Sequence, residues 1–154
     1  MLNPNPYMAL STALGFSAAD LNANRLGVLS PYQREKLSTQ RLHTLGWSAL
    51  LILLLLVGGY FLQAEFIFVV FCGACLITFM IATWQRIQED LDGHVQVITG
   101  QLTQRTLPLG RYAADVNGQT FNLPKHLTNA FNTTTHYRLY YTPGTRTILS
   151  AEII

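Results

Sequence analysis

The stretch "GYFLQAEFIF" (residues 59–68) decides how this chain is organised. Two long apolar runs meet there, and only Gln63, Ala64 and Glu65 separate them. The runs, 46–62 and 66–84, contain no Asp, Glu, Lys or Arg. As helices they would be roughly 26–29 Å long, which is close to the hydrocarbon thickness of a bilayer. We therefore expect both runs to span a membrane rather than to form the core of a soluble domain.

A turn at 63–65 is favoured over one continuous helix. A single helix over 46–84 would be about 58 Å long, roughly twice the hydrocarbon thickness. It would also bury Glu65 near the bilayer centre, where a carboxylate costs ~2.5–3.5 kcal/mol on insertion scales. A turn places that carboxylate among the lipid headgroups instead. The sequence thus predicts an antiparallel transmembrane hairpin, 46–62 and 66–84, with its tip at 63–65.

Basic residues predict the orientation of this hairpin. Four Lys or Arg residues lie between positions 25 and 41, Arg86 follows the second run, and the tip has none. Cytoplasmic loops carry the excess of Lys and Arg, so we expect both termini in the cytoplasm and Glu65 outside. Trp47 and Trp84 stand at the cytoplasmic ends of the two runs, where interfacial aromatic residues are common.

Residues 1–45 are predicted to be a cytosolic segment with short helices. Positions 1–16 carry no charge and two prolines, so we expect them to be loosely ordered or to lie on the bilayer or a partner. Ser17 with Asp20 predicts the start of a short helix that Gly27 ends. Ser30, followed by Pro31 and by Gln33 as a capping-box residue, predicts the start of another.

The remaining residues divide into a stalk and a β domain. Residues 85–93 are predicted to form an acidic helical stalk that continues the second span. Residues 94–154 alternate polar and apolar positions as strands do. Asn117-Gly118 predicts a type I′ hairpin turn that pairs Ala114 with Phe121 and Tyr112 with Leu123.

A second predicted hairpin turns at 143–144. An odd-length loop would point one set of side chains inward: Tyr137, Leu139, Tyr141, Leu149, Ala151 and Ile153. With one strand bending at Gly100 and a short helix at 124–131, the order fits a five-stranded small β-barrel of the OB or SH3-like kind. The predicted fold class is therefore an α+β membrane protein.

Two sets of residues are candidate functional sites. On the outer face of the barrel, Arg138 and Tyr140 have the composition that interface hot spots favour, and His136 and Glu152 could pair across strands beside them. The alternative is that Arg138 only covers apolar surface with its long side chain. This predicted interaction surface comprises His136, Arg138, Tyr140 and Glu152.

Small residues within the two spans form a second candidate site. Cys72 and Cys75 make a Cys-x-x-Cys pair, which invites a redox interpretation. Their mid-membrane position favours packing, because small residues let helices approach closely in a bilayer. The predicted helix-packing patch comprises Gly58, Gly59, Cys72, Gly73, Ala74 and Cys75.

Other features argue against several classes of function. None of the four histidines has a metal-ligand spacing with another ligand, and no nucleophile elbow or phosphate loop is present. We predict no enzyme activity, no cofactor and no metal site. Nucleic-acid binding by an OB-like domain is disfavoured, because only Tyr140 is expected to be exposed for stacking.

Two motifs carry a family resemblance. The first comprises Asn24, Arg25, Gly27, Leu29 and Ser30. The second comprises Tyr137, Arg138, Tyr140, Tyr141, Pro143, Leu149, Ser150 and Glu152. The chain resembles uncharacterised bacterial two-span membrane proteins that share both motifs. The resemblance implies a bacterial cytoplasmic membrane protein and brings no catalytic residue with it.

Two functions follow from these expectations. The first is a membrane-tethered interaction module that presents the β domain to a membrane or cytosolic protein, to the lipid bilayer or to a second copy of the chain. The second is an accessory subunit whose hairpin packs inside a larger membrane complex.

Overall fold

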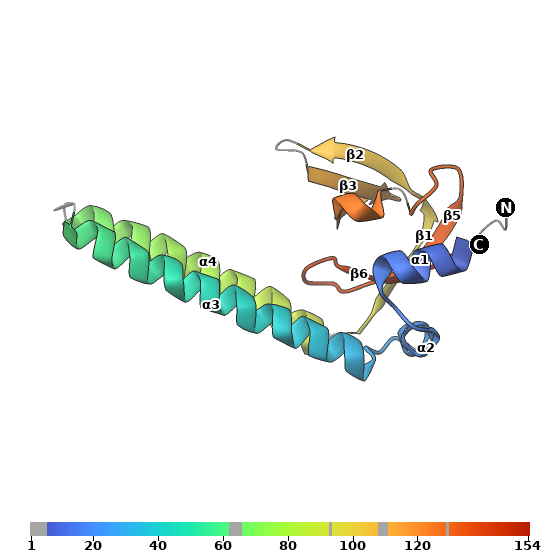
Figure 1. Cartoon of the computed structure of the whole chain (residues 1–154), viewed down its shortest axis with the longest axis horizontal. Helices are drawn as coiled ribbons and strands as arrows, with labels where there is room; N and C mark the ends of the chain where they lie inside the picture. Colours follow the sequence, from blue (N-terminus) through green and yellow to red (C-terminus); the bar gives the residue numbers. More distant parts are fainter. Residues whose placement is uncertain (1–5, 62–65, 93, 108–110, 129) are drawn as a thin grey trace.

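The computed structural model describes residues 6–61, 66–92, 94–107, 111–128 and 130–154. Four α-helices are formed within these residues: α1 (Pro6–Leu14), α2 (Ala18–Arg25), α3 (Pro31–Phe61) and α4 (Phe66–Asp92). Helices α3 and α4 lie side by side as a long arm that projects from the rest of the protein (Figure 1). The predicted tip at 63–65 lies outside the described residues.

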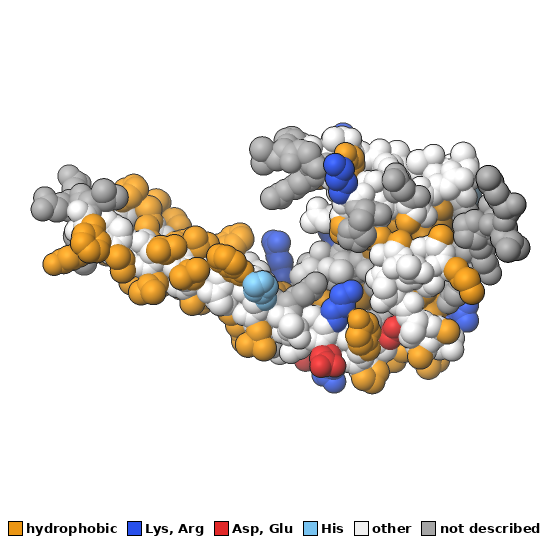
Figure 2. All heavy atoms as spheres, viewed as in Figure 1, with side chains coloured by type: hydrophobic (Ala, Val, Ile, Leu, Met, Phe, Trp, Pro, Cys, Tyr) orange, Lys and Arg blue, Asp and Glu red, His pale blue; other side chains and the backbone are white. Residues whose placement is uncertain are grey.

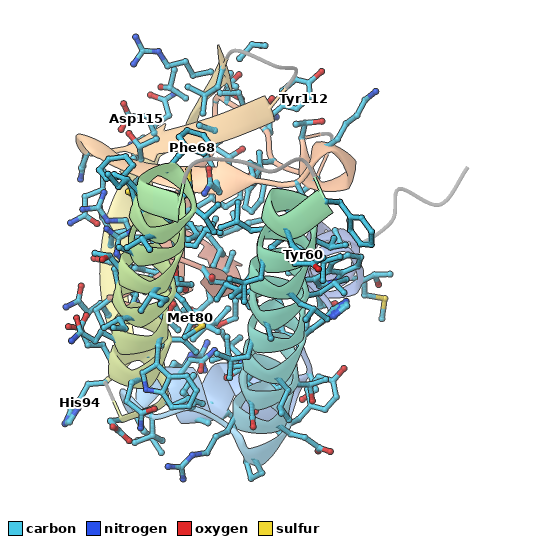
Figure 3. All side chains as sticks on the ribbon, turned by 90° about the vertical axis from the view of Figure 1, so that its left-hand side faces the viewer. Tyr60, Phe68, Met80, His94, Tyr112 and Asp115 are labelled. Carbon is cyan, nitrogen blue, oxygen red and sulfur yellow. The ribbon has the colours of Figure 1, made fainter. Side chains whose placement is uncertain are left out.

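The arm consists of two helices that are long and apolar enough to cross a membrane. Within its apolar windows no residue is buried inside the structure, so these are not core helices of the protein. Side chains radiate outward from both helices: Tyr60 points away from α3, whereas Met80 lies between the two (Figure 3). Each helix runs without a break through the predicted boundary at its polar end, so residues 85–92 of the predicted stalk are the last part of α4. Residue 93 lies outside the described residues.

The described part of the β domain forms two three-stranded antiparallel sheets rather than a closed barrel. The strands are β1 (Gln96–Gln101), β2 (Thr103–Leu107), β3 (Arg111–Val116), β4 (Gln119–Leu123), β5 (His136–Tyr141) and β6 (Ile148–Ile153). One sheet has the order β1-β5-β6 and the other β2-β3-β4. The five-stranded barrel prediction is therefore wrong.

The physical reason is a change of sheet at Leu102. The single bent strand predicted around Gly100 is two strands, because β1 pairs with β5 whereas β2 pairs with β3. Between them Leu102 is fully buried in the core. Strands that switch sheets at a corner are typical of packed sheets. The alternation of polar and apolar residues in the sequence does not distinguish a strand that switches sheets from one that only bends.

The hairpin at Asn117-Gly118 is confirmed. Ala114 pairs with Phe121 and Tyr112 with Leu123, as the turn chemistry predicts. Asn117 has φ 48° and Gly118 has φ 79°, which is the pair of positive angles that a type I′ turn requires.

The second hairpin contains a bulge that the sequence did not predict. Tyr140 pairs with Ser150, but the next residue, Tyr141, pairs with Ile148, so Leu149 is the extra residue. Leu149 consequently faces the same side as Tyr140 and not the side of Ala151. Ile153, also expected inward, is 41% exposed. The inward orientation predicted for Leu149 is therefore wrong. Ile153 stands opposite the buried Tyr137 on the predicted face, but it is not buried there.

Helices α1 and α2 complete two apolar cores. The larger core includes Leu10 of α1 together with Phe121 and Leu139. The smaller one, on the other face of the β5–β6 pair, includes Leu21 of α2 and Tyr140. The expectation that 1–16 is loosely ordered is wrong for the described part, because Leu10 is only 1% exposed. The short helix expected at 124–131 is a single 3-10 turn, η2 (Lys125–Leu127).

Candidate functional site

The two motifs of the family resemblance contact each other through side chains. Asn24 donates from Nδ2 to Ser150 Oγ at 2.7 Å, and both residues are fully buried. Arg25 Nε lies 2.7 Å from Glu152 Oε1, and the Tyr140 hydroxyl donates to the same oxygen at 2.8 Å. These bonds fasten α2 to β5 and β6.

This contact changes the interpretation of the predicted interaction surface. Tyr140 is 2% exposed, so the prediction that it faces out is wrong. The predicted His136–Glu152 pair is also wrong, because Glu152 stands opposite Arg138 and His136 stands opposite Gln101. Nothing in the sequence indicates that Tyr140 is buried, because the helix that covers its side of the sheet, α2, lies far away in the chain. His136 and Arg138 are exposed, and their role in an interface stays a prediction.

The buried contacts shift two pKa values in opposite directions. The hydrogen bond from Arg25 lowers the pKa of Glu152 below its ordinary range, against the raising effect of burial. Burial, together with the hydrogen bond to Glu152, raises the pKa of Tyr140. The site therefore favours an ionised Glu152 and a neutral Tyr140 at neutral pH.

The starts of α2 and α3 are tied together at Asp20. Its carboxylate accepts from the backbone N–H of Ser17 at 2.8 Å, from the Ser17 hydroxyl at 2.9 Å and from the Ser30 hydroxyl. Burial raises the pKa of Asp20, but the hydrogen bonds from Ser30 and Ser17 outweigh it and hold that pKa below its ordinary value. Both predicted helix caps, at Ser17 and at Ser30 with Gln33, are confirmed.

A second joint fastens the β domain to the polar end of α4. Asp90 is 1% exposed and accepts hydrogen bonds from the backbone N–H of Gly144 at 2.7 Å and of Thr145 at 3.0 Å. The Thr145 hydroxyl donates to the same carboxylate. A Cβ on Gly144 would lie 2.2 Å from the carbonyl oxygen of Arg86, so only glycine allows this approach. The loop 142–147 is therefore pinned to α4.

The pinned loop also carries a strained basic residue. The backbone N–H of Thr142 donates to the carbonyl of Thr147 at 3.1 Å, and that of Thr147 donates to the Thr142 hydroxyl at 3.2 Å, which closes the loop. Within it Arg146 has φ 53°, an angle that non-glycine residues rarely adopt. A residue held in that region is worth testing for a functional constraint.

Arg146 faces a cleft of about 790 Å³ that we call the basic hollow. The end of α1, the first turns of α3, β4 with η2, and the loop 142–147 form its walls. Its basic lining residues are Lys36, Lys125 and Arg146, and all three are exposed. No Asp or Glu is found among its described lining residues. Several Lys and Arg side chains are visible near the junction of the arm and the β domain in Figure 2.

The basic hollow continues toward the apolar arm. A neighbouring space of about 920 Å³ shares Leu37 and residues 145–147 with it and extends between α3 and α4 to Trp47 and Phe79. The carboxylates of Glu89 and Asp90 line this second space. The carboxylate of Asp90 accepts a hydrogen bond from the loop 142–147. The combined groove thus runs from basic residues at the β domain to aromatic residues on the arm. Sequence reasoning missed it because its walls come from segments far apart in the chain.

The predicted helix-packing patch is divided between two environments. A Cβ on Gly59 would lie 2.8 Å from Val69 Cγ2, so Gly59 brings α3 close to α4. At Gly58 and Gly73 a Cβ would meet no described atom within 4 Å. Cys75 is exposed, and both cysteines are free thiols. Of the three glycines of the patch, Gly59 is the one that packs closely against a described atom of the other helix; the role of the remaining residues stays a prediction.

The fold and the groove define a structural class: an α+β protein whose two-sheet domain is pinned to a long apolar helical arm. Comparison with protein-family models, with curated proteins and with solved structures finds no match to this chain. Among the described residues no group of three or more His, Cys, Asp or Glu side chains could hold a metal ion. The family resemblance stays a prediction, and the geometry alone supports the function proposed below.

Proposed function

We propose that this chain is a bacterial cytoplasmic membrane protein that holds its β domain, as an interaction module, in a fixed pose at the inner membrane surface. In this proposal the helical arm spans the bilayer as a hairpin and both termini are cytoplasmic. The observation that carries the proposal is the buried Asp90 joint between α4 and the loop 142–147.

The apolar surface of the arm supports the membrane placement. Leu54 of α3 is 57% exposed, and Phe68 and Phe79 of α4 are 61% and 69% exposed. Hydrophobic side chains cover the arm along its length in Figure 2. Soluble monomers rarely expose so large a continuous apolar surface, whereas a bilayer would cover it.

The Asp90 joint supports a fixed pose rather than a loose tether. A flexible linker needs no buried carboxylate and no glycine placed against a helix backbone. Separating the loop from α4 would break the hydrogen bonds that Asp90 accepts from Gly144 and Thr145, and a hydrogen bond to a charged group contributes ~1.5–3 kcal/mol. The β domain is therefore expected to keep one orientation relative to the bilayer, as an interaction module requires.

An accessory-subunit role is the second candidate. Open space at Gly58 and Gly73, next to the exposed Cys75, is the kind of surface that another transmembrane helix uses for close packing. In that case the protein would function within a larger membrane complex.

Cysteine labelling in intact cells tests the topology. In a Cys72→Ala, Cys75→Ala background, a single cysteine at Glu65 should react with an impermeant thiol reagent. A single cysteine at Thr133, which is exposed on the β domain, should react only after the cells are permeabilised. Labelling of Thr133→Cys in intact cells would contradict the orientation. Labelling of both sites only after permeabilisation would place them on the same side and contradict the two-span topology.

Purification in a mild detergent separates the two candidate roles. A lone or self-associated chain supports the interaction module. A stable stoichiometric complex that is lost in Gly73→Leu, but kept in Gly46→Leu, supports the accessory subunit. Gly46 is the matched control because it is also a helical glycine with open space around it.

A further inference from the structure

We infer that the basic hollow binds the phosphate headgroup of an anionic phospholipid, with the lipid's apolar part leading along the groove to the arm. This inference rests on the proposed membrane placement and names the partner of the interaction module. The argument depends on the charge of the hollow, its direction and the way that Arg146 is held.

The charge of the hollow fits a phosphate. Lys36 comes from α3, Lys125 from η2 and Arg146 from the loop 142–147, so three separate elements bring one cation each to a single cleft. The described lining of the hollow itself contains no Asp or Glu. Asp20 interacts electrostatically with Lys36. Glu89 and Asp90 line the adjoining space that Arg146 shares. Within the described part of the chain, no side-chain hydrogen bond or ion pair joins these three cations to another residue, so each is available to an anion in the hollow. Arg binds phosphate through two parallel N–H groups, and Lys contributes a point charge.

The apolar residues that line the hollow favour an amphiphilic ligand over a free anion. Apolar residues, among them Leu14, Leu37 and Leu123, line the same cleft. From there the groove continues past residues 145–147 to Trp47 and Phe79 on the arm. A soluble phosphate would use only the basic end of this groove. A phospholipid matches both ends, because its headgroup is anionic and its acyl chains belong in the bilayer that would surround the arm.

The position of the hollow fits a lipid of the inner leaflet. Sheet β2-β3-β4 overhangs the polar end of the arm (Figure 1), and the hollow lies between the arm and the β domain (Figure 2). Trp47, which lines the groove, is the residue that the sequence places at the cytoplasmic interface. A headgroup at that depth would need little displacement from the bilayer surface to reach the three cations.

The pinned loop explains why Arg146 is suited to this task. Asp90 fixes the neighbouring residues Gly144 and Thr145, and the hydrogen bonds between Thr142 and Thr147 close the loop around them. Arg146 is thereby held at the boundary of the two spaces with φ 53°. A preorganised cation loses less conformational freedom when its ligand arrives.

Fluorescence quenching by brominated lipids tests the inference on the full chain. The protein carries two tryptophans, so a Trp84→Phe background leaves Trp47 as a single reporter in the groove. Nanodiscs of phosphatidylcholine receive the same small fraction of either brominated phosphatidylglycerol or brominated phosphatidylcholine. We expect the anionic brominated lipid to quench Trp47 several-fold more strongly than the neutral one.

Matched charge variants locate the site. Lys36→Gln, Lys125→Gln and Arg146→Gln together should lower the preference for phosphatidylglycerol by roughly tenfold, since each cation near an anionic headgroup contributes a few-fold. The control, Arg34→Gln with Arg105→Gln, removes two charges from exposed positions outside the hollow and should change the preference by less than about twofold. Both variants must keep the far-ultraviolet circular dichroism spectrum of the parent protein. If the hollow triple variant fails to fold, Arg146→Gln alone replaces it.

Each possible outcome has a defined meaning. Strong but equal quenching by both lipids would keep the membrane placement and overturn the lipid site. No quenching by either lipid would contradict the membrane placement itself. Equal losses per removed charge in the hollow variant and in the control would assign the preference to general surface charge and would overturn the hollow as the binding site. Loss of the preference when millimolar inorganic phosphate is added would identify a soluble anion as the occupant and overturn the lipid assignment.

Discussion

Gly144→Ala is the sharpest test of the joint between the β domain and the arm. The new Cβ would lie 2.2 Å from the Arg86 carbonyl oxygen and 2.9 Å from Asp90 Oδ1. Because the first of these atoms belongs to a helix backbone, the loop must move and not the helix. A shift of about 1 Å is needed to restore an ordinary contact distance of roughly 3.2 Å or more between such atoms.

The magnitude follows from the bonds that such a shift breaks. The N–H groups of Gly144 and Thr145 lie 2.7 Å and 3.0 Å from the Asp90 carboxylate, and a displacement of about 1 Å takes both beyond hydrogen-bonding distance. Hydrogen bonds to a charged group contribute ~1.5–3 kcal/mol each, so we expect the loss of two to cost about 3–6 kcal/mol. For a chain of this length the loss corresponds to a decrease in Tm of at least ~6 °C.

The assay is hydrogen exchange and thermal unfolding of the full chain in detergent micelles. Amides of the loop 142–147 and of the last turns of α4 should lose protection in Gly144→Ala, while the arm near Gly58 should not change. Gly46→Ala is the control, because a Cβ there meets no described atom within 4 Å. If Gly144→Ala kept native exchange in the loop and the Tm of the parent protein, the loop would not contact α4, and the proposed fixed pose would fail with it.

Three further predictions address the rest of the structure. Leu10→Ala should cost ~2–5 kcal/mol of stability by chemical denaturation, because Leu10 is 1% exposed in the core; Met8→Ala, at a 66% exposed position of the same helix, should cost little. Equal effects would mean that α1 does not pack on the sheets. Gly118→Val should remove protease resistance of the β domain, because a β-branched residue is strained at φ 79°; unchanged resistance would contradict the turn. Glu152→Gln should lower stability at pH 7, and the gap to the parent protein should narrow as the pH falls below about 4; a pH-independent gap would contradict an ionised Glu152.

The sign of the pH effect follows from the lowered pKa of Glu152. A carboxyl group whose pKa is lower in the folded state stabilises the fold above its ordinary pKa, and it loses this contribution as the pH falls through the folded value. The Arg25 side chain that causes most of the shift is 52% exposed, so salt should weaken the effect as well.

Local chemistry in the sequence predicted the elements that depend on neighbouring residues. The caps at Ser17 and Ser30, the turn at Asn117-Gly118 and the two long apolar helices each follow from a few adjacent positions, and the structure has all of them. Such features can be predicted without information about the rest of the fold, because the residues that form them are neighbours in the sequence.

Features that depend on distant partners could not be predicted in this way. The burial of Tyr140 requires α2, which lies more than a hundred positions earlier in the chain. The bulge at Leu149 and the change of sheet at Leu102 alter which face a side chain points to, and alternation alone gives no sign of either. The basic hollow could not be predicted either, because its cations lie far apart in the sequence and line one cleft only in the folded chain: Lys36, Lys125 and Arg146.

The fastening of α2 to β6 has a consequence for how the protein is made. Its two bonds join residues separated by 126 and 127 positions, and both predicted spans are synthesised in between. The apolar faces of α1 and α2 therefore stay uncovered during synthesis until β6 has left the ribosome. Under the membrane placement proposed above, integration of the hairpin would precede closure of the domain. A chain that stalls before β6 would leave α1 and α2 without their partner strand, and such exposed apolar surface is prone to aggregation.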